Sequence, residues 1–214
     1  MHKSIPVPTQ ARGRRGSLFK ERLLLVSPEI AFIGDSILAK FAEDGQAVWE
    51  KNYSHLNSGN MGTVGDSTQM LIEKLERDML PLEDTQIVVL MIGATDLRHK
   101  LKVSVVFDQI RKIIQMLQAG CRSGVKIMIL GVLPRGDSNV DCNDAIAETN
   151  EMLTNLENGF TMRFVTLQSQ FYDKEKNKIR EELFHTDRIN LNEKGYEVLA
   201  NAIHPVLQEF LQSK

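Results

Sequence analysis

The sequence predicts an α/β protein, a three-layer α/β/α sandwich around a five-stranded parallel sheet of flavodoxin-like type. Short apolar runs recur along the chain, and the segments between them carry apolar residues at helical spacing. The runs are apolar on both faces, as in Ile127-Met128-Ile129-Leu130. A strand of that composition is typical of a parallel sheet that helices cover on both sides. Right-handed crossovers between such strands place helices in both outer layers.

Each strand candidate is an apolar run that ends near a glycine or a polar turn. In chain order these runs cover residues 30–34, 55–59, 87–92, 125–131 and 162–167. The helix candidates are amphipathic segments between or after these runs, and they cover residues 37–43, 67–79, 103–119, 143–156 and 193–212. Because parallel strands end at the same edge of a sheet, we expect the polar residues after the strands to share one edge, where ligands bind in such folds.

Length and composition predict one domain and a tail. With 214 residues, of which 42% are hydrophobic and 25% charged, the chain can bury one substantial core. We expect residues 1–27 to be a basic, partly disordered N-terminal tail and residues 28–214 to form the domain. The chain has no apolar run of membrane-spanning length, and its N-terminus lacks a signal-peptide core, so we expect a cytoplasmic protein without a membrane partner. Cys121 and Cys142 lack metal-type spacing and are expected to be reduced thiols, and no metal or cofactor is predicted.

The most informative stretch is the first strand candidate, which stops on Gly34-Asp35-Ser36. It is typical of a buried strand that delivers a serine to the first turn of a helix, where a hydroxyl is accessible. Taken alone, these three residues more often make a turn and a helix cap. Other motifs follow in order: Gly62 to Thr68, the elbow Gly93-Ala94-Thr95-Asp96, Leu130 to Asp137, and Asp187 to Asn192 before the last helix candidate.

This ordered set resembles the SGNH (GDSL) hydrolase family over residues 28–211, with the strongest likeness to the catalytic subunits of platelet-activating-factor acetylhydrolase. The resemblance implies that Ser36 stands at the nucleophile and that Gly62 supplies a backbone N–H to the oxyanion hole. It places Thr95 where the family has an asparagine oxyanion donor. Asp187 matches the acid of the family's Asp-x-x-His, and Asn190 takes the place of the histidine.

The two substitutions predict an inactive pseudo-hydrolase in which Ser36, Gly62 and Asp187 are vestigial. An asparagine amide cannot take the serine proton, and removing a triad base costs on the order of a million-fold in rate. Threonine is a shorter donor than asparagine, and the loss of one oxyanion donor costs roughly a hundred- to a thousand-fold. Among the histidines, only His185 lies where it could substitute as a base, two residues before Asp187.

Charge distribution predicts RNA as the partner, although the net charge is only −2. Basic residues gather in the tail and directly after the Thr95-Asp96 elbow, as is typical of segments that meet phosphates. The predicted RNA-binding residues are Arg12, Arg14, Arg15, Lys20, Arg22, Arg98, Lys100 and Lys102. In its fold and degenerate site the chain is similar to the C-terminal OSK domain of Oskar, an SGNH-like domain that binds messenger RNA and organises germ plasm. That similarity implies a developmental role through binding to messenger RNA 3′ untranslated regions.

Two other functions stay open at this stage. The chain is an active short-chain acyl esterase or acetylhydrolase if Ser36 finds another base. It is a protein-interaction scaffold without RNA if the resemblance to acetylhydrolase subunits, which form dimers and partner complexes, extends to their surfaces. Protein partners and a homodimer therefore remain alternatives beside RNA.

Overall fold

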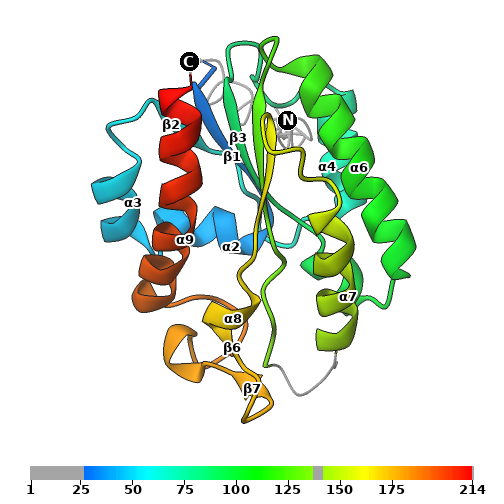
Figure 1. Ribbon diagram of the computed structural model, residues 1–214, viewed down its shortest axis with the longest axis vertical. Coiled ribbons are helices and arrows are strands. Elements are labelled where there is room, and N and C mark those ends of the chain that lie inside the picture. Colours follow the sequence, from blue (N-terminus) through cyan, green and yellow to red (C-terminus); the bar gives the residue numbers. More distant parts are fainter. Residues whose placement is uncertain (1–26, 137–141, 214) are drawn as a thin grey trace, which may run out of the picture.

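A computed structural model describes residues 27–136 and 142–213 of the protein. Its centre is a sheet of five parallel strands in the order β2-β1-β3-β4-β5, which lies between helical layers (Figure 1). The strands are β1 Ile30–Gly34, β2 Ser58–Asn60, β3 Ile87–Met91, β4 Lys126–Leu130 and β5 Met162–Val165. The predicted fold class, a five-stranded parallel sheet inside an α/β/α sandwich, is confirmed.

Two helical layers cover the sheet, and each has its own part of the core. In Figure 1 the first layer lies on the left and the second on the right. The first layer holds α2 Ser36–Ala39, the 3-10 turn η1 Lys40–Ala42, α3 Gln46–Asn52 and α9 Glu193–Gln212. The second holds α4 Thr68–Glu76, α6 Val103–Gly120 and α7 Asn143–Thr154. Smaller elements complete the chain: α5 Ala94–Arg98, α8 Gln168–Phe171, β6 Tyr172–Asp173, β7 Lys178–Ile179 and η2 Glu181–Leu183.

Alternation along β1 explains why the strands are apolar on both faces. Ile30 and Phe32 belong to the core on the α9 side, whereas Ala31 and Ile33 belong to the core on the α6 side. All of these residues are buried. Because successive side chains of a strand point to opposite faces, a strand between two helical layers needs apolar residues at every position.

An aromatic cluster fixes the helix that follows β1. Phe41 stacks on Tyr196 of α9, with ring centroids 4.7 Å apart, and also packs edge-on against Phe32 and Trp49. The Tyr196 hydroxyl donates a hydrogen bond to the Ile37 carbonyl at 2.8 Å. Helix α9, near the end of the chain, therefore holds the short helix α2 in place.

Several predicted boundaries were wrong. The second strand lies at Ser58–Asn60 rather than 55–59, and the helix expected over 37–43 changes to a 3-10 turn at Lys40. The helix expected to reach residue 79 ends at Glu76, and Asp78 beyond it has a left-handed backbone with φ of 49°. Helices α3 and α5 and the β6-β7 hairpin were not predicted. Within the described residues, no helix is both long and apolar enough to cross a membrane.

Candidate active site

Strand β1 and helix α2 place Ser36 at the carboxyl edge of the sheet. The Asp35 carboxylate caps α2 by accepting a hydrogen bond from the Ile37 N–H at 3.1 Å, and Ser36 is the first residue of the helix. Gly34 allows β1 to pass close to β3, because a Cβ at this position would lie 1.8 Å from the Met91 carbonyl oxygen. The expected presentation of a serine after a buried strand is therefore what the structure shows.

Gly65, and not Gly62, directs its backbone N–H at the nucleophile position. The Gly65 N–H donates to Ser36 Oγ at 3.1 Å, whereas the Gly62 N–H donates to Asn60 Oδ1 at 3.0 Å. Gly62 instead allows the loop to pack on α2, since a Cβ there would lie 2.3 Å from the Ala39 nitrogen. The oxyanion-hole role of Gly62 stays a prediction, and the N–H that meets Ser36 Oγ is that of Gly65. Both glycines stand in the same sequence motif, and only the path of the loop distinguishes them.

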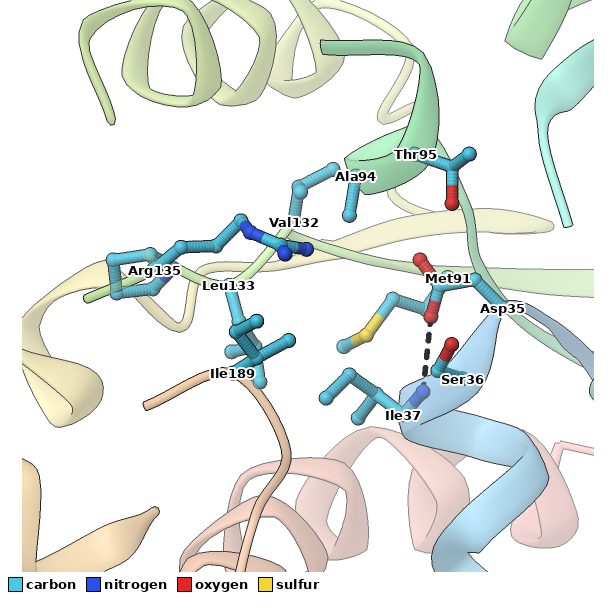
Figure 2. A pocket seen from close by; sticks show the side chains of 11 residues that line it. Asp35, Ser36, Ile37, Met91, Ala94, Thr95, Val132, Leu133, Arg135 and Ile189 are labelled. Carbon is cyan, nitrogen blue, oxygen red and sulfur yellow. Dashed lines mark hydrogen bonds between the residues drawn. The ribbon is translucent and has the colours of Figure 1, made fainter. Parts of the chain in front are cut away.

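Thr95, on α5, lines a small pocket with Ser36 (Figure 2). In this view the hydroxyls of Thr95 and Ser36 lie on the same side of the hollow as the Asp35 carboxylate. The cavity has a volume of about 40 Å³. Its lining residues are Asp35, Ser36, Ile37, Met91, Ala94, Thr95, Val132, Leu133, Pro134, Arg135 and Ile189. The structure therefore brings together the two predicted residues Ser36 and Thr95.

Asn190 donates two hydrogen bonds to Asp187. Its side-chain Nδ2 and its backbone N–H both donate to the Asp187 carboxylate, the latter at 2.9 Å. The Ile189 N–H also donates to Asp187 at 2.9 Å. Partial burial raises the pKa of Asp187, but these hydrogen bonds outweigh it and leave the pKa below its usual value. Asp187 is thus an ionised acceptor for the side-chain and backbone N–H groups of Asn190.

His185 faces another carboxylate. Its Nε2 lies 3.5 Å from Asp44 Oδ2. The histidines at 55, 99, 185 and 204 are all exposed, and none of them lines the pocket of Ser36.

Asp35 and Arg135 are two members of the pocket whose roles the sequence did not reveal. Burial raises the pKa of Asp35 to about 7, while the Ile37 N–H and the charge of Arg135 act against this rise. Asp66 and Asp96 add to it as neighbouring carboxylates. Both residues lie in motifs quoted from the sequence, but a buried carboxyl and an arginine at one pocket can only be recognised in three dimensions.

The predicted RNA-binding residues fall into two groups. Arg98, Lys100 and Lys102 are exposed between the end of α5 and the start of α6, directly after Thr95 and Asp96. The predicted tail residues Arg12, Arg14, Arg15, Lys20 and Arg22 lie outside the described residues. Cys121 and Cys142 are buried free thiols, and burial raises the pKa of Cys121 to about 11. The described ranges contain no group of histidine, cysteine and acidic side chains that could hold a metal ion.

Comparison with known proteins matches residues 32–198 to the GDSL-like lipase/acylhydrolase family. Platelet-activating factor acetylhydrolase IB subunit alpha1 of Rattus norvegicus is 26% identical over 185 residues, which cover 86% of this chain and 77% of the relative. The human alpha2 subunit is 23% identical over 186 residues, covering 86% and 78%.

Solved structures agree with this match in fold. A GDSL-like lipase from Bacteroides thetaiotaomicron superposes with a TM-score of 0.72 at 13% identity, covering 91% of this chain and 98% of the other. A member of the lipolytic protein G-D-S-L family from Veillonella parvula superposes with a TM-score of 0.67 at 21% identity, covering 84% and 97%. At these identities the structures show a shared fold.

Proposed function

We propose, from the premise that the chain belongs to the GDSL-like lipase/acylhydrolase family, that it is a pseudo-hydrolase which serves as a binding module. The observation that carries this proposal is the hydrogen bond from Asn190 Nδ2 to Asp187. The sequence motif has asparagine at the position of the family's histidine, and an amide nitrogen that donates to the acid has no basic lone pair for the Ser36 hydroxyl.

The oxyanion side of the pocket supports the same proposal. Thr95 is a shorter donor than asparagine, and the Gly62 N–H is engaged by Asn60. The Gly65 N–H remains as a donor near Ser36. Without a base and with a shorter side-chain donor, the two losses in rate multiply. The base would take the proton of the Ser36 hydroxyl, whereas the donor would stabilise the oxyanion, so each change affects a different part of the transition state.

The test is hydrolysis of p-nitrophenyl acetate by the full chain. We expect its rate to equal that of the Ser36→Ala variant, since an unactivated serine does not compete with solvent. A fluorophosphonate probe should leave Ser36 unlabelled when the intact protein is weighed by mass spectrometry. A rate that depends on Ser36, or stoichiometric labelling, would instead establish the alternative of an active short-chain esterase, the activity that the names of the acetylhydrolase relatives describe.

RNA is the proposed partner, and one surface feature favours it. Arg98 ends α5, three residues after the pocket residue Thr95, and Lys100 and Lys102 follow before α6, so an exposed basic segment follows the pocket residue in the chain. Because the net charge of the protein is −2, contact with RNA would depend on this local segment and on the tail rather than on the overall field.

Charge reversal tests the RNA surface. The triple variant Arg98→Glu, Lys100→Glu, Lys102→Glu should lower affinity for single-stranded RNA at least about tenfold, because it replaces attraction to phosphates by repulsion. For the unmodified chain, affinity should fall with salt at a log–log slope of about −0.7 per phosphate contact. Fluorescence anisotropy measures both quantities, and the melting temperature should hardly change because exposed charges contribute little to folding.

A matched control has the same change of charge on another loop. Lys174, Lys176 and Lys178 lie around the β6-β7 hairpin, where Lys176 pairs with Asp173 at 3.2 Å. Reversing these three lysines should leave RNA affinity within about twofold. A separate variant with Arg12, Arg14 and Arg15 changed to glutamate measures how much the tail contributes to RNA affinity. Two results would rule out this surface and favour the protein-scaffold alternative. One is an RNA affinity that does not change with salt concentration, and the other is an affinity that neither the triple variant at 98, 100 and 102 nor the tail variant lowers.

A further inference from the structure

A second hollow lies at the amino edge of the sheet, opposite the edge that carries Ser36. It has a volume of about 420 Å³ and lies where β3 and β4 begin and where α9 ends, at the top of Figure 1. It is lined by residues 86–87, 122–126, 210 and 213, and we call it the amino-edge groove. The Lys126 N–H donates to the Gln86 carbonyl at 2.9 Å, and the Arg122 N–H donates to the Thr85 carbonyl at 3.2 Å. These bonds fix the two segments that enter β3 and β4 side by side.

The amino-edge groove is cationic, although the net charge of the chain is −2. Arg122 and Lys126 line it, and none of the described residues in its lining carries a carboxylate. The Lys126 ammonium already donates to the carbonyls of Phe210 and Ser213 at 2.7 and 3.0 Å, so it has less to offer a ligand. Arg122 is exposed, and its guanidinium has no hydrogen-bond or ion-pair partner among the described residues. An anion would therefore gain the donors of a guanidinium without displacing an existing contact.

A tight turn beside the guanidinium adds backbone donors. The Val125 N–H donates to the Arg122 carbonyl at 3.0 Å, and Gly124 has a left-handed backbone with φ of 80°. In the part of the chain that the structure describes, the N–H groups of Ser123 and Gly124 and the Ser123 hydroxyl have no partner. A Cβ at Gly124 would meet nothing within 4 Å, so a ligand can approach the backbone here. Successive N–H groups in a turn form concavities that bind anions.

We propose that the amino-edge groove binds a phosphate monoester of nucleotide size. The phosphate accepts hydrogen bonds from the Arg122 guanidinium and from the turn at Ser123 and Gly124. The organic part extends from the turn toward α9, over a floor to which Val125 and Phe210 contribute. The volume of the groove, about 420 Å³, lies in the range of small-ligand sites. This inference goes beyond the proposed function, because the groove uses no residue of the candidate active site.

Charge and donor number favour a phosphate monoester over other anions. Near neutral pH a phosphate monoester carries about 1.5 to 2 negative charges and three acceptor oxygens. A carboxylate has a single charge and two oxygens in one plane, so it leaves part of this donor set unused. Inorganic phosphate has the charge but no organic part to fill the remainder of the groove. A free mononucleotide and the 5′ end of an RNA chain both supply the required group, and they share its chemistry.

Isothermal titration calorimetry of the full chain tests the proposal near neutral pH and at constant ionic strength. We expect saturable binding of adenosine 5′-monophosphate with a dissociation constant of about 10 μM to 1 mM. Adenosine lacks the charge and inorganic phosphate lacks the organic part, so each should bind at least about tenfold more weakly.

An RNA tetranucleotide distinguishes the two sources of the phosphate. It is titrated once with a 5′-phosphate and once with a 5′-hydroxyl. If the ligand is an RNA end, the phosphorylated form should bind at least about tenfold more tightly than both the hydroxyl form and the mononucleotide. If the ligand is a free nucleotide, adenosine 5′-monophosphate should bind at least as tightly as the phosphorylated tetranucleotide.

Variants of the exposed turn locate the binding. Arg122→Gln should weaken binding of the mononucleotide at least about tenfold, because it removes both the charge and the fork of donors. Arg122→Lys keeps the charge without the fork and should weaken binding severalfold, and Ser123→Ala should have a smaller effect. Arg111→Gln is the matched control on the exposed face of α6, where Arg111 lies 3.7 Å from Asp108, and it should leave affinity unchanged. Because these side chains are exposed, the melting temperatures without ligand should hardly differ.

Thermal unfolding supplies a second readout. Adenosine 5′-monophosphate should raise the melting temperature of the unmodified chain more than sodium chloride does at equal ionic strength, and it should not raise that of Arg122→Gln. The proposal is overturned by absence of saturable heat, by equal affinity for the mononucleotide and adenosine or phosphate, or by unchanged affinity of Arg122→Gln. The triple variant at 98, 100 and 102 should bind the mononucleotide as the unmodified chain does, so failure of the RNA surface and failure of this groove are distinguishable.

Discussion

The double variant Asn190→His, Thr95→Asn should hydrolyse p-nitrophenyl acetate at least about a hundredfold faster than the unmodified chain. A triad base contributes on the order of a million-fold and one oxyanion donor a hundred- to a thousand-fold, so even partial recovery is a large signal. The reason to expect recovery is the existing geometry. Asp187 already accepts a hydrogen bond from the side chain at position 190, and the Gly65 N–H already lies 3.1 Å from Ser36 Oγ.

The controls show how much of the gained activity depends on each residue. Adding Ser36→Ala should return hydrolysis to background, and adding Asp187→Ala should remove most of the gain because the imidazole loses its orienting partner. The single variant Asn190→His should recover more than Thr95→Asn alone, since a donor has little use without a base. If the double variant folds like the unmodified chain and stays inert, the loss of activity is not confined to positions 95 and 190.

Gly34→Ala should have the largest effect on stability among the substitutions considered. The added Cβ would lie 1.8 Å from the Met91 carbonyl oxygen and 3.3 Å from the Leu38 side chain, and the first contact is with backbone that cannot rotate away. Strands β1 and β3 would have to separate at the point where Ser36 is presented. We expect the free energy of unfolding to fall by about 3 kcal/mol or more, as measured by urea denaturation.

Gly120→Ala is the matched control for that substitution. Gly120 is the last residue of α6, and a Cβ there would meet nothing within 4 Å. Its replacement should leave stability unchanged or raise it by up to about 1 kcal/mol, because alanine restricts the unfolded chain more than glycine does. A Gly34→Ala protein as stable as this control would show that β1 and β3 need not approach so closely.

The sequence predicted the elements whose burial is continuous. The first strand was placed at its observed bounds, 30–34, and the third and fourth were placed within one residue at each end, because apolar runs between two helical layers leave a clear pattern. Strand β2 was misplaced because Ser58-Gly59-Asn60 has no apolar side chain and lies at the sheet edge. Helix α5 and the β6-β7 hairpin are too short for a periodic pattern.

The candidate site was predictable only as far as motifs mark single residues. Motif order led to Ser36, Thr95, Asp187 and Asn190, and the structure joins them in two pairs, Ser36 with Thr95 and Asp187 with Asn190. Which of the two glycines, Gly62 or Gly65, directs its N–H at Ser36 Oγ depends on the path of the loop before α4, and residue types do not show that path. The pKa of Asp35 depends on burial and on carboxylates that are distant along the chain, so it could not be read from the sequence.

The hydrogen bond between Asp187 and Asn190 also bears on how this chain can evolve. The codons for asparagine and histidine differ in their first base only, and those for threonine and asparagine can differ in their second base only. Two point mutations in the gene would therefore install both residues that a working triad and oxyanion hole require. Because the amide keeps the acid oriented and ionised, the scaffold would not need to be rebuilt first. Under the pseudo-hydrolase proposal, the chain lies two point mutations from the residue pattern of the hydrolase family that its sequence resembles.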